Sequence, residues 1–355
     1  IYALYNSIVM ILTIIATGRY DAAIIVEKDD EKVKSLWWLS LIISFIFNLI
    51  LFGLFYFFSA QLTGYFKQNS LEKWLLIMPF SVFVGTIIKP KLGLNTKHHA
   101  QSAYESWIGG CDMVKDDENL ASQKFNTFEK RLVKTLEMAD KAESETGEKK
   151  AYLVNVTAET NEMIRRAELA EQQGSKYIMT AGWAALQTLR ESNFKTAIHA
   201  HRAMHAAFDR NPYQGINMMV IADFAKLIGV DQLHIGTGIG KLSGKIEDIM
   251  SIQENIENKN IKKTKLRLGK NWEKIKSTLG VSSGGLQPRH IPFLVKHLGK
   301  DLIIQAGGGI HGHPSGTKAG AKAMRQAVDA VMKRESLKQY SKNHKELKEA
   351  LEKWK

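Results

Sequence analysis

Short apolar runs alternate with amphipathic stretches along the chain from about residue 85 onward. Stretches such as 100–108, 158–173 and 184–191 place apolar residues at helical spacing. The apolar runs lie near residues 84–89, 111–117, 151–156, 175–179, 196–201, 231–236, 280–283 and 302–306. Short buried strands that alternate with helices are typical of a parallel sheet. Eight such units in about 250 residues predict an α/β fold, the (β/α)8 TIM barrel.

Residues 1–84 have a different pattern. The chain carries no charged residue between Lys34 and Lys67, and Trp, Leu, Ile and Phe dominate this run. About 20 consecutive apolar residues are enough to span a bilayer as a helix. The few polar side chains form a narrow stripe, which suits contact with another membrane helix better than contact with water. We therefore expect residues 36–60 to cross or enter a membrane, and residues 1–18 to form a second, marginal span. A buried helix of a soluble domain is the alternative.

The change of pattern predicts three parts. Residues 1–84 form a transmembrane helical fragment, residues 85–332 a barrel, and residues 333–355 a charged surface helix that frays at its end. The sequence has no initiator Met and no signal-peptide pattern, so it reads as an internal part of a longer frame. We expect the barrel in the cytoplasm, associated with a membrane if the N-terminal helices are truly fused to it.

The charge balance is basic, with a formal net charge of +13. Much of the excess lies in residues 259–276 and 333–355, where aromatic residues do not interleave with the basic ones. These stretches are therefore interpreted as solvated faces, and no nucleic-acid partner is expected. The single cysteine, Cys111, excludes an intrachain disulfide. Its apolar surroundings predict a reduced, inert core thiol.

The second apolar run ends in one lysine and three carboxylates. Side chains alternate along a strand, so Lys115 and Asp117 share a face, and Glu118 joins them once the chain turns. Grouped carboxylates suit a hard cation such as Mg²⁺. A lysine fits such a cluster only if its amine becomes an anion, for example a carbamate formed with CO₂. A solvated charged turn is the alternative.

Other predicted strands also end in residues that can carry chemistry. Lys89 and Lys91 follow the first strand, and a lysine beside a metal can move protons. His199 and His201 share one face of the fifth strand, and a zinc site is the generic alternative there. Glycines around Lys241, after the sixth strand, indicate either a mobile lid or an ordinary surface loop.

The last two predicted strands run into glycine-rich segments, Ser282-Ser283-Gly284-Gly285 and Gln305-Ala306-Gly307-Gly308-Gly309. Glycine lets backbone N–H groups approach an anion closely, and TIM barrels often bind phosphate after these two strands. Tight turns that need a positive φ are the alternative.

The motif Lys115-Asp116-Asp117-Glu118-Asn119 resembles the activation motif of the ribulose-bisphosphate carboxylase (RuBisCO) large chain. The resemblance covers about residues 85–333, and the sequence of residues 88–94 is most similar to that of the archaeal, form III-like enzyme. It implies one Mg²⁺ per site, held by Asp117, Glu118 and a CO₂-derived carbamate on Lys115.

The same resemblance implies the remaining site residues. Lys89 and His201 are catalytic in proton transfer, and Lys241 stabilises the transition state of CO₂ addition. His199 and His205 are expected to be structural. The substrate and its phosphates are bound by Lys91, Arg202, His234, Ser283, Gly284, Gly285, Gly307 and Gly308.

The implied activity is that of a carboxy-lyase. In the family, Mg²⁺ polarises ribulose 1,5-bisphosphate, a base forms an enediolate, and addition of CO₂ leads to two molecules of 3-phosphoglycerate. O₂ is the competing substrate in the oxygenase reaction. The family forms homodimers or higher homo-oligomers, so a second copy is the expected protein partner.

Two departures from the family pattern bear on activity. The segment after Met179 is about four residues shorter than is usual in the family, which predicts imperfect barrel closure. Residues 1–84 do not read as the α+β domain that precedes the barrel in the family, so impaired turnover is expected. Residues 18–31 resemble polysaccharide or O-antigen flippases. The alternative function is therefore a transporter fragment joined to a non-functional barrel.

Overall fold

The computed structural model describes residues 42, 82–91, 93–211, 213–241 and 244–354. The predicted membrane spans and the flippase-like segment lie outside these ranges, apart from single positions. Among the helices within the ranges, none has both the length and the apolar character that a membrane crossing requires.

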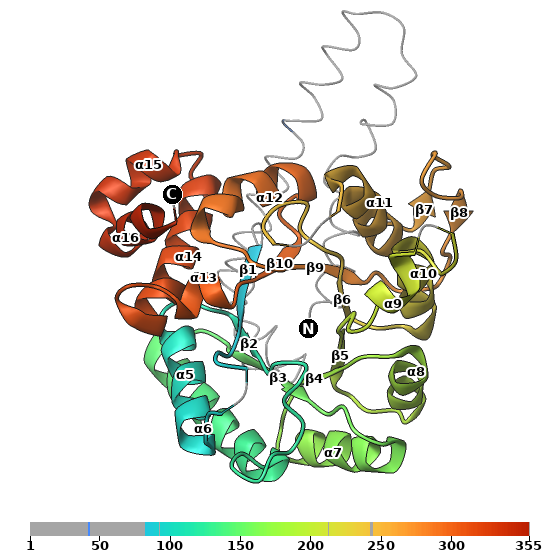
Figure 1. The fold of residues 1–355 in the computed structure, drawn as a ribbon, viewed down its shortest axis with the longest axis horizontal. Helices are drawn as coiled ribbons and strands as arrows, with labels where there is room; N and C mark the ends of the chain where they lie inside the picture. The colour runs from blue at the N-terminus through green and yellow to red at the C-terminus, as the bar shows by residue number, and fades with distance from the viewer. Residues whose placement is uncertain (1–41, 43–81, 92, 212, 242–243, 355) are drawn as a thin grey trace, which may run out of the picture. The chain divides into compact units, whose positions relative to one another are not determined.

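Eight parallel strands close into a barrel, and Figure 1 shows the helices arranged around it. Around the barrel the strands follow chain order, and the last pairs with the first. The strands are β1 (Val82–Ile87), β2 (Met113–Lys115), β3 (Ala151–Asn155), β4 (Tyr177–Thr180), β5 (Ala197–Ala200), β6 (Gln232–His234), β9 (Leu279–Ser283) and β10 (Leu302–Gln305). The predicted TIM barrel is confirmed, since each predicted run overlaps one of these strands.

The outer ring consists mainly of helices that follow the strands. They are α5 (Thr96–Ile108), α6 (Phe128–Thr146), α7 (Thr160–Gln172), α8 (Trp183–Glu191), α10 (Met218–Ile228), α11 (Ile246–Glu257), α12 (Ile291–Leu298) and α14 (Gly316–Met332). Two short helices, α9 (Ala206–Asp209) and α13 (Gly308–His311), lie in strand-to-helix connections. An antiparallel pair that the sequence pattern did not predict, β7 (Asn260–Ile261) with β8 (Lys270–Asn271), separates α11 from β9.

Local signals set several of the helix ends. The Asn95 side chain accepts a hydrogen bond from His98 N at 2.9 Å and so caps α5. Helices α6 and α10 end at Gly147 and Gly229, which adopt left-handed φ values of 70° and 86°. These caps satisfy backbone groups at helix ends and turn the chain back toward the next strand.

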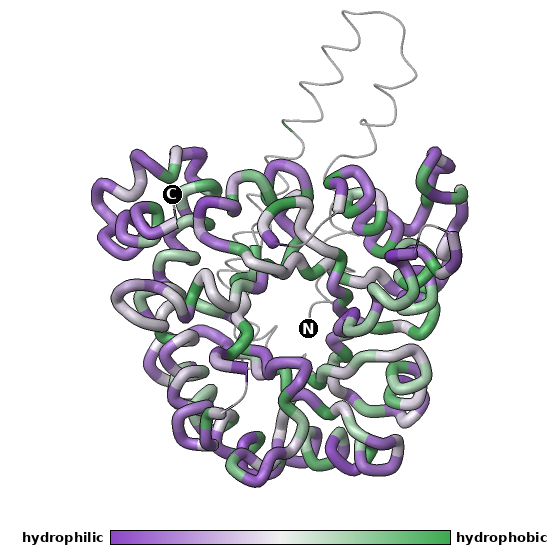
Figure 2. Tube along the Cα trace, viewed as in Figure 1, coloured by the Kyte–Doolittle hydropathy of each residue, from purple (hydrophilic) through white to green (hydrophobic). Residues whose placement is uncertain are grey.

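The hydrophobic core has two layers. The larger layer lies between the strands and the inner faces of the helices, and hydropathy alternates along the outer helices, as helices with one buried face require (Figure 2). A smaller cluster fills the barrel interior with Met113, Leu153, Val281 and Ile303. The two layers leave the strand ends as the place for polar side chains.

The predicted defect at the fourth strand is wrong. Strand β4 pairs in parallel with β3 over three residue pairs and with β5 over four, and the barrel is closed. Ala181 and Gly182 suffice to connect β4 to α8. Gly182 has φ 91°, a value that a residue with a side chain rarely adopts, so glycine makes this abrupt turn possible.

The predicted frayed surface helix at the C-terminus is also corrected. The tail forms α15 (Leu337–Tyr340), the 3₁₀-helix η2 (Ser341–Asn343) and α16 (Lys345–Lys353), which pack against α14. Tyr340, Leu347 and Ala350 are buried. Leu347 and Ala350 are three residues apart and lie on one helical face, so a short apolar stripe is enough to hold the tail.

Cys111 is buried immediately before β2, and burial raises the pKa of its thiol to about 12. The prediction that Cys111 lies in the core is therefore confirmed, and the raised pKa is consistent with low reactivity.

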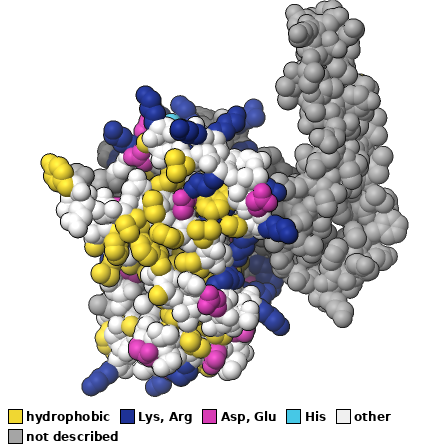
Figure 3. All heavy atoms as spheres, turned by 90° about the vertical axis from the view of Figure 1, so that its right-hand side faces the viewer, with side chains coloured by type: hydrophobic (Ala, Val, Ile, Leu, Met, Phe, Trp, Pro, Cys, Tyr) yellow, Lys and Arg dark blue, Asp and Glu magenta, His cyan; other side chains and the backbone are white. Residues whose placement is uncertain are grey.

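The face of the barrel shown in Figure 3 exposes a group of apolar side chains. Val220, Phe224 and Leu227 project from α10, and the Phe224 ring lies 5.2 Å from that of Trp183.

Candidate active site

The buried amine of Lys115 lies at the carboxyl end of β2. Its Nζ donates to the backbone oxygen of Asp116 at 2.8 Å, and it lies 3.2 Å from Met179 Sδ and 3.6 Å from Glu118 Oε2. Burial lowers the pKa of Lys115 to about 8, although the neighbouring carboxylates oppose this shift. A lowered pKa increases the fraction of neutral amine, the form that reacts with CO₂.

Two carboxylates face this amine from the following turn. Lys89 Nζ donates to Asp117 Oδ2 at 2.7 Å, and Asn119 donates to Asp117 Oδ1 from its backbone N and from Nδ2. Burial alone would raise the pKa of Asp117, but the hydrogen bonds from Lys89 and Asn119 lower it. Lys91 Nζ lies 3.8 Å from Glu118 Oε1. The two carboxylates are therefore surrounded by positive charge.

This donor set fits a hard dication once Lys115 carries a carbamate. Within the described residues, no group of three or more His, Cys, Asp and Glu side chains is arranged to hold a metal. Asp117 and Glu118 supply two carboxylates, and a carbamate on Lys115 would add a third anionic oxygen ligand. A carbamate provides such oxygens, which suit Mg²⁺.

A buried network behind the cluster holds the turn in place. Asp116 points away from Lys115, and its carboxylate accepts from Tyr152 Oη at 2.7 Å and from Arg131 Nε at 3.1 Å. Asn155 N donates to the same carboxylate at 3.0 Å. Burial would raise the pKa of Asp116, but Arg131 and the nearby His99 hold it well below its usual range.

Asn155 also fixes the backbone of the turn. Its Nδ2 lies 3.2–3.3 Å from the carbonyl oxygens of Asp117, Glu118 and Leu120. This side chain comes from β3, the strand next to β2. The position of both carboxylates therefore depends on a neighbouring strand as well as on their own.

The histidines of β5 and β6 meet next to the cluster. His201 Nε2 lies 3.7 Å from Glu118 Oε2, and its ring centroid lies 4.5 Å from that of His234. His201 Nδ1 is buried without a hydrogen-bond partner among the described residues. Burial, with a further contribution from Lys115, lowers the pKa of His201 well below its ordinary value. A neutral imidazole of this kind can accept a proton.

The generic zinc alternative does not fit this geometry. His199 Nε2 and His234 Nε2 lie 2.8 Å apart, which is a hydrogen bond between the rings. The remaining ring nitrogens bond to Gln232 and Ser283. All four nitrogens are therefore engaged, and His199 and His234 leave no lone pair for a metal.

The glycine-rich segments pack against Lys89 and Lys241. Lys241 N donates to Gly284 O at 3.3 Å, and a Cβ at Gly285 would lie 2.5 Å from Lys241 Cγ. A Cβ at Gly307 would lie 2.9 Å from Lys89 Cε, whereas Gly308 faces open space. Gly285 has φ 68° and lies against both the backbone and the side chain of Lys241, so glycine is favoured there, whereas at Gly307 the flexible end of Lys89 could move aside.

Arg202 lies beside Ile235 and Gly236, at the start of the loop that connects β6 to Lys241. Its Nη1 donates to Ile235 O at 3.3 Å, and a Cβ at Gly236 would lie 3.3 Å from its Nη2. These contacts join β5 to the loop after β6.

All predicted site residues lie at the carboxyl ends of the strands, in β1, β2, β5, β6, β9 and β10 or in the segments that follow them. Contacts of 2.7–3.8 Å join Lys89, Lys91, Lys115 and His201 to Asp117 or Glu118. Sequence reasoning did not find the supporting residues His99, Arg131, Tyr152, Asn155, Met179 and Gln232. Their spacing carries no signal, because they come from other helices and strands.

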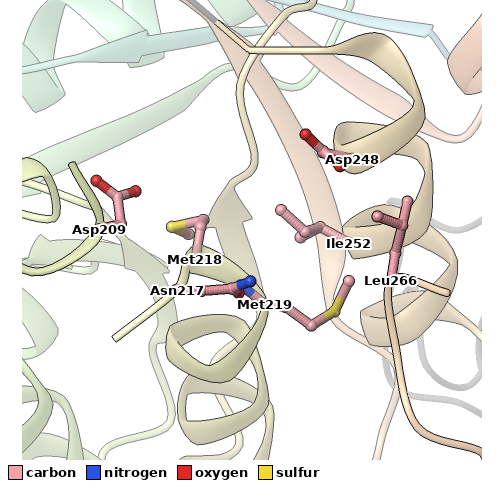
Figure 4. Close-up of a pocket in the computed structure, with 7 residues that line it drawn as sticks. All are labelled: Asp209, Asn217, Met218, Met219, Asp248, Ile252 and Leu266. Atoms are coloured by element: carbon pink, nitrogen blue, oxygen red, sulfur yellow. The ribbon is translucent and has the colours of Figure 1, made fainter. Parts of the chain in front are cut away.

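A separate pocket lies among α9, α10, α11 and the segment before β8 (Figure 4). Met218, Met219, Ile252 and Leu266 give it apolar walls, and Asp209 and Asp248 place carboxylates beside it. Its lining includes none of the predicted site residues.

Residues 69–354 match the family described as "Ribulose bisphosphate carboxylase large chain, catalytic domain". The chain is 54% identical to the ribulose bisphosphate carboxylase of Methanocaldococcus jannaschii over 278 residues, which are 77% of this chain and 65% of the relative. It is 48% identical to that of Pyrococcus abyssi over 276 residues, 76% of this chain and 62% of the relative. The chain thus spans slightly less than two thirds of these relatives.

Solved structures give the same result. An octameric ribulose-1,5-bisphosphate carboxylase/oxygenase from Pyrococcus horikoshii superposes with a TM-score of 0.72 at 44% identity, covering 79% of this chain and 64% of that one. A dimeric archaeal RuBisCO from Hyperthermus butylicus gives a TM-score of 0.73 at 43% identity, covering 78% and 66%. The resemblance to archaeal enzymes is thereby confirmed. The chain belongs to the family of the ribulose bisphosphate carboxylase large chain, of which it contains the catalytic domain.

Proposed function

We propose that this barrel catalyses the carboxylation of ribulose 1,5-bisphosphate to two molecules of 3-phosphoglycerate, with O₂ as the competing substrate. The observation that carries the proposal is the buried amine of Lys115, whose lowered pKa and two facing carboxylates suit carbamate formation. Family membership supports the same reaction.

In the first step that we propose, the neutral Lys115 amine attacks CO₂. An N–C bond forms, one C–O π bond opens, and the nitrogen releases one proton to solvent. The resulting carbamate, Asp117 and Glu118 would hold Mg²⁺. When bound, Mg²⁺ would stabilise negative charge on the substrate's oxygen atoms.

The remaining residues are assigned by their positions. Lys89 and His201 lie within 4 Å of the carboxylate pair, where they would move protons during enolisation. Lys241 would place its ammonium against the new carboxylate. Lys91, Arg202, Ser283 and the glycines Gly284, Gly285, Gly307 and Gly308 would bind the substrate and its phosphates. His234, whose ring nitrogens bond to His199 and Ser283, would contribute to phosphate binding through Ser283.

The oligomer and the N-terminal residues are further parts of the proposal. The solved relatives are named as octameric and dimeric, and we propose a homo-oligomer for this chain as well. A membrane-inserted segment at residues 36–60 and the flippase alternative stay predictions, since both concern residues outside the described ranges.

The test is detection of the carbamate by ¹³CO₂ NMR. We expect a carbamate signal in the wild-type protein with Mg²⁺, and its loss in Lys115→Ala. Lys226→Arg is the matched control, because Lys226 is also buried with its pKa lowered to about 8. A signal that survives in Lys115→Ala, or one that disappears in Lys226→Arg, would overturn the assignment.

A further inference from the structure

A continuous chain of hydrogen bonds runs between strands β5, β6 and β9. Gln232 Oε1 lies 2.7 Å from His199 Nδ1, and the two Nε2 atoms of His199 and His234 lie 2.8 Å apart. His234 Nδ1 lies 2.7 Å from Ser283 Oγ. All four side chains are buried, with at most 9% exposure. Both rings are almost completely shielded from water, and only the Ser283 end of the chain is partly accessible.

The short distance between the two rings restricts their protons. Two nitrogens 2.8 Å apart need one donor and one acceptor. Burial, with nearby positive charge, lowers the pKa of His199 to about 3 and that of His234 well below its ordinary value. Both rings are therefore neutral, and each carries a single N–H.

A neutral imidazole passes on the direction of a hydrogen bond, because it donates from one nitrogen and accepts at the other. Only two arrangements of the chain are then possible. In the first, Gln232 Oε1 accepts from His199 Nδ1–H, His199 accepts from His234 Nε2–H, and His234 accepts from the Ser283 hydroxyl. In the second, the Gln232 amide group donates, every bond is reversed, and His234 donates to Ser283 Oγ.

The two arrangements contain the same number of protons but present different groups to the strand ends. In the first, the Ser283 hydroxyl proton is used inside the chain, and Ser283 can only accept from a ligand. In the second, this proton is free to point outward and donate. An anionic ligand needs a donor at this position.

We propose that Gln232 is a positioning residue that sets the donor or acceptor state of Ser283 through His199 and His234, and that binding of a phosphate group selects the donating state. The inference rests on the proposed role of Ser283 in binding substrate phosphate. In the structure Gln232 Oε1 faces His199 Nδ1, the orientation that the first arrangement requires.

The tautomers are measured by long-range ¹H–¹⁵N NMR of histidine-labelled protein, with inorganic phosphate as the probe. We expect Nδ1–H on His199 and Nε2–H on His234 without phosphate, and the opposite tautomers at saturation. His201 is the internal control, because its ring contacts His234 but lies outside the chain. Unchanged tautomers at saturating phosphate, or no phosphate binding, would overturn the proposal.

Variants separate positioning from simple structural support. Gln232→Glu offers only acceptor oxygens at this position, so it locks the first arrangement. The tautomers of His199 and His234 should then stay unchanged when phosphate is added. Ser283→Ala is expected to lower phosphate affinity about tenfold in the wild-type background, but less than twofold in Gln232→Glu. Equal losses in both backgrounds would contradict the relay. The new carboxylate repels phosphate equally with and without Ser283→Ala, so this repulsion cancels when each loss of affinity is measured within one background.

The result is independent of turnover. A chain that switches tautomers but gives no carbamate signal on Lys115 would retain the relay and lose the carboxylase assignment. Turnover without a change of tautomer would retain the carboxylase assignment and contradict the relay.

Discussion

The side chains of consecutive residues at the end of β2 lie on opposite faces and have different roles. Lys115 and Asp117 lie on the face toward the candidate metal site, whereas Asp116 lies on the other face and binds Arg131, Tyr152 and Asn155. The alternation along a strand predicted the first face correctly. It did not show what Asp116 binds, because those partners come from α6 and β3.

Asp116→Asn is expected to lower the free energy of unfolding by about 3 kcal/mol, because it leaves the buried Arg131 guanidinium without its counter-charge. Equilibrium denaturation measures this loss. Glu118→Gln is the matched control at the half-buried neighbour, and it should weaken Mg²⁺ binding with little loss of stability. Equal stability losses in the two variants would contradict the distinction between support and metal binding.

The ion pair between Asp116 and Arg131 also predicts how the free energy of unfolding depends on pH. The pKa of Asp116 is lower in the folded chain than its usual value of 3.8, so its stabilising contribution is complete above that value. The contribution is lost as the pH falls from about 4 towards the folded-state pKa. The stability difference between wild type and Asp116→Asn should therefore narrow below about pH 4. A constant difference down to pH 3 would indicate that the carboxylate charge is not the cause.

At the scale of the elements, the repeated alternation of strands and helices predicted the structure well, whereas the two departures from it were predicted wrongly. The eight strands and most of the site follow from apolar runs and from the polar residues at their ends. Closure of the barrel at the fourth strand and packing of the tail did not follow from the pattern, because both depend on tertiary contacts. Strand β4 needs only a few ladder bonds on each side, and the tail needs only a small apolar stripe against α14.

Leu347→Ala tests the packing of the tail. Leu347 is fully buried, so its truncation is expected to cost about 3 kcal/mol of unfolding free energy. Lys348→Ala, at the exposed neighbouring position, should change stability by less than about 0.5 kcal/mol. Chemical denaturation and limited proteolysis within residues 335–354 measure both. If Leu347→Ala behaves like the control, the tail does not contribute to the fold.

At the scale of the whole molecule, the barrel brings together residues that are far apart in sequence. Lys89, Lys115, His201 and Lys241 come from four different strands or the segments after them, and a parallel barrel places these ends at one mouth. The fold therefore explains how six separate motifs form one site. The sequence pattern predicted this convergence, but not the buried side chains that hold it.

The 355-residue chain by itself is expected to bind Mg²⁺ and CO₂ better than it turns over. Lys91 and Lys241 are exposed, and Glu118 keeps 26% of its side chain in solvent, so the mouth of the barrel is open to water. Water screens the charges that would stabilise the transition state, and loss of such preorganised interactions costs about 100-fold or more in rate. The matched region makes up 65% of the Methanocaldococcus jannaschii enzyme, which is therefore a suitable longer reference.

The measurement is ¹⁴CO₂ incorporation into acid-stable product by the purified chain with Mg²⁺ and ribulose 1,5-bisphosphate. The enzyme of Methanocaldococcus jannaschii is assayed alongside as the reference. Lys115→Ala should abolish the remaining activity, whereas the surface variant Lys348→Ala should retain it. A rate equal to that of the reference would contradict the expectation, because it would mean that the barrel alone excludes water and completes the site.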